Sequence, residues 1–151
     1  MVCVYCGGRT KVVNSRPQRR SNSIWRRRAC ATCRAVFTTE ESANLSGSVM
    51  VEKQGGGLQP LLREKLVISL ATALKHHPEP ITTASELANT ILGKLLLGSR
   101  SASVTSTDII HTSEETLRRF DYSAYLRYVA EYSTGSVKSL RRIKPSQSDG
   151  Q

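Results

Sequence analysis

Two Cys-x-x-Cys pairs constrain the fold of this chain more than any other feature of its sequence. Cys3 and Cys6 form the first pair, and Cys30 and Cys33 form the second. Each pair turns two thiolates toward one ion at a Zn–S distance of about 2.3 Å, and two pairs complete a tetrahedral shell with no position left for a reacting water. A single pair also fits a thioredoxin-like redox site, but the second pair favours metal. The sequence therefore predicts one structural zinc ion per chain.

The length of the chain explains why the ion is needed. The 151 residues allow one ordinary domain or two small ones, and a segment of about 45 residues cannot bury enough apolar surface to fold without a staple. All four cysteines lie within the first 33 residues. Since no apolar run is long enough for a signal peptide or a membrane span, we expect a cytoplasmic protein with reduced thiols and no membrane contact.

The positive charge of the chain is concentrated around the cysteines. Residues 1–45 carry eight arginines and one lysine against two glutamates, which accounts for +7 of the formal net charge of +10. The planar guanidinium group forms bidentate contacts with phosphates and guanine edges, whereas the ammonium group of lysine acts as a point charge. The charge pattern predicts a nucleic-acid-binding zinc ribbon. The alternative interpretation is a solvated basic surface that has no partner.

The composition changes after the basic segment. Residues 42–47 lack an arginine or lysine and an aromatic side chain, which predicts a linker. A β-prone run at 49–53, followed by the glycines at 55–57, predicts a hairpin. Apolar residues then recur with helical spacing, which predicts two amphipathic helices. The apolar stripe of the first is expected at Val67, Leu70, Ala71 and Leu74, and that of the second at Ala88, Ile91, Leu92 and Leu95.

Polar residues predict where the later helices begin. Thr83 with Glu86 three residues later has the pattern of a capping box, which predicts the start of the second helix. A third helix is expected from about Thr105 to Phe120, and Asp121 is expected to cap a fourth. These elements predict an α+β fold, in which a small β-rich zinc ribbon precedes a mostly helical domain with a short N-terminal hairpin.

The order of these motifs resembles that of the NrdR family, bacterial repressors of ribonucleotide reductase genes. The two cysteine pairs and the runs 11–16, 26–28 and 37–40 resemble its zinc ribbon. The run 51–53, Gly56, Pro60, and the runs 65–66 and 125–132 resemble its ATP-cone. The resemblance implies a DNA-binding ribbon at 1–45, a nucleotide-binding and oligomerising ATP-cone at 46–135, and a polar basic tail at 136–151, which we expect to be disordered.

The resemblance also implies ligands and their contacts. The ribbon is expected to bind double-stranded operator DNA in promoters of ribonucleotide reductase genes through Arg16, Arg26, Arg27 and Arg28. ATP and dATP are expected to bind the cone and to control the homo-oligomeric state and the affinity for DNA. The expected nucleotide contacts are Val51, Lys53, Gly56, Gln59, Lys65, Tyr125, Arg127 and Tyr132. Asn14, Gln59 and Leu61 stand where the family usually has aspartate, glutamate and phenylalanine.

The glycine-rich turn also has a chemical interpretation that needs no family. Such a turn lets the backbone approach a phosphate chain closely, and Lys53 and Lys65 are placed to point at the same anion. The chain has no Walker motif. Ordinary surface lysines are the alternative for these two residues. Core packing is the alternative for Tyr125 and Tyr132.

Two classes of function therefore remain. The first is a nucleotide-sensing transcriptional repressor, and the second is an RNA- or ribosome-associated zinc-ribbon protein with a helical interaction domain. We do not expect an enzyme, because the zinc shell is closed and no acid/base pair is visible. His76 and His77 are expected to be helix-end or surface histidines.

Overall fold

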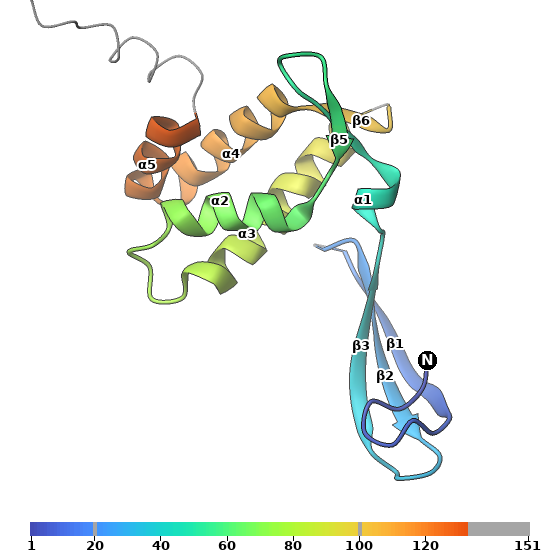
Figure 1. Cartoon of the computed structure of the whole chain (residues 1–151). Coiled ribbons are helices and arrows are strands. Elements are labelled where there is room, and N and C mark those ends of the chain that lie inside the picture. The colour runs from blue at the N-terminus through green and yellow to red at the C-terminus, as the bar shows by residue number, and fades with distance from the viewer. Residues whose placement is uncertain (20, 100, 133–151) are drawn as a thin grey trace, which may run out of the picture.

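A computed structural model shows an antiparallel β-ribbon followed by a mostly helical region (Figure 1). It describes residues 1–19, 21–99 and 101–132. The order of its strands and helices confirms the predicted α+β class. The tail predicted at 136–151 lies outside the described residues.

The ribbon consists of three antiparallel strands in the order β1-β2-β3. They span β1 (Thr10–Gln18), β2 (Ser23–Cys30) and β3 (Val36–Ser42). The first cysteine pair precedes β1, and the second lies at the end of β2 and in the turn that leads to β3. Both pairs therefore meet at the end of the ribbon that lies farthest from the helices (Figure 1).

The ribbon has almost no apolar interior. Among its described residues up to position 42, only Cys3, Ser23 and Cys30 are buried, and the single tryptophan, Trp25, is half-buried. A three-stranded sheet with both faces open to water buries too little apolar surface to be stable alone. The structure thus agrees with the prediction that a metal ion stabilises this segment.

A small sheet opens the second region. It contains β4 (Met50–Glu52), β5 (Leu58–Pro60) and β6 (Ser103–Thr105) in the order β5-β4-β6. The β4–β5 hairpin is confirmed, with Gly56 in its turn at a φ of 82°. The parallel strand β6 was not predicted, because three residues after a serine-rich segment give no strand signal of their own.

Five helices complete this region. They are α1 (Leu45–Ser48), α2 (Arg63–Ala73), α3 (Pro80–Gly98), α4 (Ser106–Phe120) and α5 (Tyr122–Tyr132). Their core contains the fully buried Leu70, Leu74, Ile91 and Leu117. No helix in the described ranges is both long and apolar enough to cross a membrane.

Two local predictions differ from the structure. Helix α3 begins at Pro80 rather than at Thr83, because proline at the first position has a backbone φ already suited to a helix. Thr83 donates its backbone N–H to the carbonyl oxygen of Glu79 at 3.0 Å, the first i to i−4 hydrogen bond of the helix, so it lies one turn inside the helix rather than at its cap. The linker predicted at 42–47 contains most of α1, which is capped by the side chain of Asn44.

The caps of the last two helices agree with the sequence. The hydroxyl of Thr105 accepts the backbone N–H of Asp108 at 3.0 Å at the start of α4. The carboxylate of Asp121 accepts the N–H groups of Ser123 and Ala124 at 2.8 and 3.1 Å at the start of α5. Each side chain satisfies donors that a helix N-terminus leaves unpaired.

Candidate metal centre and nucleic-acid interface

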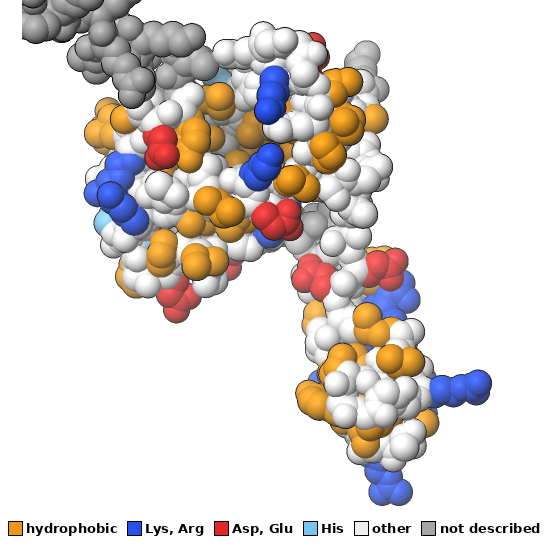
Figure 2. All heavy atoms as spheres, in the orientation of Figure 1, with side chains coloured by type: hydrophobic (Ala, Val, Ile, Leu, Met, Phe, Trp, Pro, Cys, Tyr) orange, Lys and Arg blue, Asp and Glu red, His pale blue; other side chains and the backbone are white. Residues whose placement is uncertain are grey.

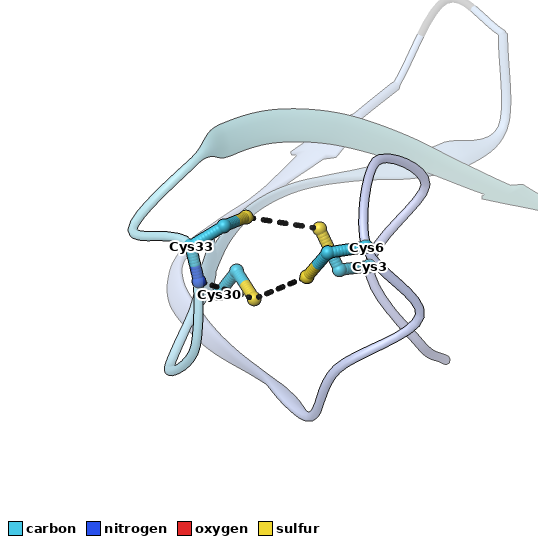
Figure 3. A group of neighbouring side chains, drawn as sticks. All are labelled: Cys3, Cys6, Cys30 and Cys33. Atoms are coloured by element: carbon cyan, nitrogen blue, oxygen red, sulfur yellow. Dashed lines mark hydrogen bonds between the residues drawn. The ribbon is translucent and has the colours of Figure 1, made fainter.

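The four cysteines converge on one point between two loops (Figure 3). All four Sγ atoms lie within 4.8 Å of one another. Cys3 and Cys33 are 3.7 Å apart at sulfur, and Cys6 and Cys30 are 3.6 Å apart. A tetrahedral site with Zn–S bonds of about 2.3 Å has sulfur–sulfur edges of about 3.8 Å. The residues therefore fit one zinc ion, and the predicted set of ligands is the set that the structure brings together.

The two cysteine loops repeat the same backbone arrangement. The N–H of Cys3 donates to the carbonyl oxygen of Gly8 at 2.9 Å, and the N–H of Cys30 donates to that of Ala35 at the same distance. The residue after each pair has a positive φ, 70° at Gly7 and 60° at Arg34. Glycine adopts this conformation freely, whereas for an arginine it costs about 1–2 kcal/mol.

Gly8 is a functional position that the sequence analysis did not identify. A Cβ at this position would lie 2.4 Å from the hydroxyl oxygen of Thr32 and 3.3 Å from the sulfur of Cys6. Only a glycine lets the first loop pack directly against the second. The available signal was the Gly-Gly dipeptide after the first pair.

The electrostatics of the cluster favour a bound cation. The N–H of Cys33, and then that of Thr32, stabilise the thiolate of Cys30 and lower its pKa to about 6, despite burial. The N–H of Ala35 lowers the pKa of Cys33, but the neighbouring thiols, led by Cys6, and burial together raise it to about 12. The last thiol is thus hard to ionise beside the other three. A divalent cation offsets this repulsion and favours all four thiolates.

The register of the ribbon divides the four candidate arginines between its two faces. Arg16 on β1 lies opposite Trp25 on β2, and Asn14 lies opposite Arg27. Directly paired residues of an antiparallel sheet point to the same face, and side chains alternate along each strand. These four residues therefore share one surface, which we call the Arg16/Arg27 face.

The other two arginines lie on the opposite surface, which we call the Arg26/Arg28 face. Arg26 forms an ion pair with Glu41 on β3 at an Nη2–Oε2 distance of 2.9 Å. Arg28 donates from Nε to the hydroxyl oxygen of Thr39 at 3.1 Å. Both guanidinium groups are therefore engaged by the neighbouring strand.

Arg16 and Arg27 are exposed, and within the described ranges neither has a hydrogen-bond or ion-pair partner. Figure 2 shows basic side chains projecting from the ribbon into solvent. The structure thus does not gather the four arginines on one surface. Their contacts with DNA stay a prediction, and only two of them are unengaged.

Five of the predicted nucleotide contacts come from consecutive elements. Val51 on β4 is buried and pairs with the half-buried Gln59 on β5. Lys53 is exposed at the start of the turn that contains Gly56. Lys65 is exposed in the first turn of α2, which follows β5 directly. The hairpin and the start of α2 therefore carry the two predicted lysines close along the chain.

The remaining predicted contacts lie on α5. Tyr132 stacks on Tyr128 with ring centroids 4.8 Å apart, and burial raises the pKa of Tyr132. Tyr125 is half-buried and contacts the ring of Tyr122 at a centroid distance of 5.6 Å. Core packing therefore accounts for much of their contact surface. A nucleotide role for both tyrosines stays a prediction.

Arg127 lies at the far end of α2 from Lys65. Its Nη1 donates to the carbonyl oxygen of Ala73, the last residue of α2, at 3.4 Å and also contacts Nδ1 of His76. Lys65 lies eight residues earlier on the same helix, a distance of about 12 Å along its axis. The structure does not bring Arg127 together with the lysines.

His76 connects two helices. Its Nε2 lies 2.7 Å from Oδ2 of Asp121, the residue that caps α5. The N–H of Ala124, together with His76, holds the pKa of Asp121 below its ordinary value. His76 is exposed just after the end of α2, as the sequence predicted. The pairing was missed because 45 residues separate the partners and no local pattern marks it.

A closed four-sulfur site at the end of a three-stranded antiparallel sheet defines a zinc-ribbon protein. A family model described as "Transcriptional repressor NrdR-like, N-terminal domain" matches residues 1–41. This match covers both cysteine loops and nearly all of β3.

Relatives extend the similarity to the helical region. A transcriptional repressor NrdR from Symbiobacterium thermophilum is 33% identical over 132 residues, which are 87% of each chain. The NrdR of Nitrosomonas eutropha is 35% identical over 87% of this chain and 82% of its own. That of Afipia carboxidovorans is 37% identical over 87% and 83%. The chain belongs to the NrdR family of transcriptional repressors.

Proposed function

We propose that this chain is a nucleotide-sensing repressor of ribonucleotide reductase genes that acts in the cytoplasm and is not an enzyme. Its zinc ribbon binds operator DNA, and its helical region acts as an ATP-cone for ATP and dATP. The observation that carries the proposal is the match to relatives named transcriptional repressor NrdR across 87% of the chain, which includes both regions. The RNA- or ribosome-associated alternative accounts for the ribbon but not for that match.

The charge distribution supports DNA binding by the ribbon. Residues 1–45 carry +7, whereas residues 46–132 carry nine cations and nine carboxylates. Contacts with phosphates supply most of the sequence-independent affinity of a protein for DNA. A neutral helical region contributes little to this term, so the ribbon is the part of the described chain suited to DNA.

The hairpin between β4 and β5 supports nucleotide binding by the helical region. Gly56 needs glycine for its positive φ. A Cβ at Gly55 or Gly57 would meet no atom within 4 Å, so packing within the chain does not require glycine at either position. Small residues beside Lys53 leave the backbone open to a phosphate chain. This is the property expected of a loop that closes over a nucleotide.

The proposed coupling is through assembly. ATP and dATP change the affinity for DNA only if each nucleotide favours a different homo-oligomer, because a ligand that binds two states equally shifts nothing. Repression is expected when dATP is abundant. Because the repressed genes encode ribonucleotide reductase, repression would reduce the synthesis of deoxynucleotides.

The proposal is tested with a promoter fragment of the ribonucleotide reductase genes in gel-shift titrations with ATP, dATP, both or neither. Light scattering under the same conditions measures oligomer size. Lys53→Ala and Lys65→Ala each remove a cation from the proposed phosphate site and should weaken nucleotide binding about tenfold to a hundredfold. Lys75→Ala removes an exposed lysine beyond the end of α2 and serves as the matched control.

The lysine variants should keep their zinc and lose the nucleotide dependence of both DNA binding and oligomer size. Wild-type protein whose size and DNA affinity are the same with every nucleotide would contradict the sensing role. Protein with zinc that does not bind the promoter fragment under any condition would contradict the repressor role itself.

A further inference from the structure

We infer that the Arg16/Arg27 face of the ribbon is the surface that contacts DNA, and that the Arg26/Arg28 face points away from it. The inference rests on the proposed function and identifies the surface that the function uses. It narrows the four predicted arginines to Arg16 on β1 and Arg27 on β2.

The first argument is geometric. Arg27 alternates with Arg26 and Arg28 along β2, so the run cannot present all three side chains to one surface. Arg16 comes to the side of Arg27 through the pairing of β1 with β2, which includes an irregularity between Val12 and Asn14. One groove of DNA meets one face of a thin sheet, so one pair of arginines is placed to contact it.

The second argument is the availability of each pair. The side chain of Arg26 is 31% exposed and is held by Glu41, whose own side chain is 64% exposed. A phosphate on this face would have to compete with that carboxylate and would be repelled by it. The Arg16/Arg27 face also carries a glutamate, Glu40, which lies opposite Trp25 in the same cross-strand row as Arg16. Its Oε1 accepts a hydrogen bond from the hydroxyl of Ser23, and within the described residues it forms no ion pair with either arginine. Arg16 and Arg27 are free of such contacts in the described chain.

The third argument is the chemistry of the neighbouring side chains. Asn14 lies directly opposite Arg27, and cross-strand partners have Cβ atoms about 4.5–5.5 Å apart. Arginine forms bidentate contacts with guanine, asparagine forms them with adenine, and a β-ribbon fits the major groove. The Arg16/Arg27 face therefore pairs two side chains suited to reading adjacent bases, whereas Arg26 and Arg28 lie beside a glutamate and a threonine.

Two double variants of equal charge test the inference. R16A/R27A and R26A/R28A each remove two cations from the same three-stranded sheet. Binding of each to a fluorescein-labelled promoter duplex is measured by anisotropy at several salt concentrations, with zinc content as the control for folding. R16A/R27A should lose affinity about tenfold to a hundredfold, and its log–log salt slope should fall by about 0.9 for each of the two arginines that contacts a phosphate rather than a base. R26A/R28A should lose at most about threefold, from long-range electrostatics alone.

Two further measurements separate the face from a general loss of charge. Trp25 is the only tryptophan of the chain and lies on the Arg16/Arg27 face, so duplex DNA should protect its fluorescence from acrylamide. Asn14→Asp keeps the shape of the side chain but removes its donor, so it should change the preferred base with no change in zinc content. Asn14→Ala should weaken binding without a new preference.

The outcomes distinguish the face from the function. If wild-type protein with a full complement of zinc bound no duplex, the repressor proposal would fail and this inference with it. If wild type bound but R26A/R28A lost as much affinity as R16A/R27A, or more, the face would be wrongly assigned while the repressor proposal stood. Acrylamide quenching of Trp25 that DNA leaves unchanged would also overturn the assignment.

Discussion

The ribbon and the helical region are stabilised in different ways. In the described part of residues 1–42, two cysteines and one serine are the only buried residues, and the cysteines surround a point suited to a metal ion. The helical region instead buries a continuous apolar cluster drawn from β4, β6 and helices α2 to α5. The fold of the ribbon is expected to depend on a metal ion, whereas the helical region is stabilised by the removal of apolar surface from water.

The two regions also differ in the side chains that they expose to solvent. The ribbon has almost no buried interior, so side chains on both faces of its strands are largely exposed, and these include the cations Lys11, Arg16 and Arg27. The helical region must keep one side of each helix apolar, and its charges balance. A segment stabilised by metal therefore offers more of its sequence to a partner than a segment stabilised by a core.

The largest expected effect is the loss of the ribbon without loss of the helices. Cys30→Ser removes one ligand, and structural zinc contributes about 10–16 kcal/mol of apparent binding energy to such folds. Zinc content and the fluorescence of Trp25 should report an unfolded ribbon, while far-ultraviolet circular dichroism should retain the helical signal. Ala31→Ser, an exposed position between two ligands, is the control and should bind zinc normally. Loss of the helical signal in Cys30→Ser would show that the two regions do not fold independently.

The reciprocal variant targets the helical core. Leu70→Ala leaves a cavity at a fully buried position of α2 and should lower the free energy of unfolding by about 2–5 kcal/mol. Urea titration followed by circular dichroism measures the change, and zinc content should stay the same. Ile68→Ala, on the exposed side of the same helix, should change stability by less than about 0.5 kcal/mol. Equal losses in both variants would contradict the assigned core.

The smallest expected effect is at the polar contact between Asp121 and His76 in the helical region. Asp121→Ala removes the cap of α5 and the partner of His76, and should cost about 1 kcal/mol. Because the folded pKa of Asp121 lies below its ordinary value of 3.8, its charge stabilises the folded state above that value, and this contribution is lost as the pH falls through the lowered pKa. Urea titrations at neutral pH and near pH 3 measure the difference.

Asp121→Asn is the matched control for that measurement. Asparagine keeps an oxygen that can cap α5 but has no carboxylate to titrate. It should retain most of the stability at neutral pH and lose the part of the pH dependence that Asp121 contributes. If the stability of Asp121→Asn fell with acid as steeply as that of the wild type, other carboxylates would be the source of the pH dependence.

Local chemistry made some features predictable from sequence. The cysteine spacing predicted the four residues whose sulfurs the structure brings together, because two residues between thiols let both turn toward one ion. The helical stripe of Ala88, Ile91, Leu92 and Leu95 is buried as predicted. In the first helix the stripe was partly misplaced: Leu66 and Ala73 are buried, whereas the predicted Val67 and Ala71 are half-buried. Short helices tolerate such a rotation because several apolar positions compete for the core.

Contacts between residues far apart in the sequence were harder to predict. The alternation of side chains along a strand would have separated Arg27 from Arg26 and Arg28, but the sequence analysis grouped all three. The side on which Arg16 lies depends on the register of β1 and its irregularity. The ion pair of Arg26 with Glu41, and that of His76 with Asp121, likewise join segments with no shared local pattern. Strand β6 forms only because the completed fold brings it beside β4.

The position of Cys30 at the end of β2 links metal binding to the register of the strands. Cys30 is the last residue of β2, and it alternates in phase with Arg26 and Arg28 and out of phase with Trp25 and Arg27. A slip of one residue between the strands would turn every side chain of β2 to the opposite surface. Such a slip would also turn the Cys30 thiol away from the other three sulfurs. Zinc binding therefore also fixes the register of the sheet. Only the observed alignment of the strands both brings Cys30 to the other three sulfurs and places Trp25 and Arg27 on one face with Arg16.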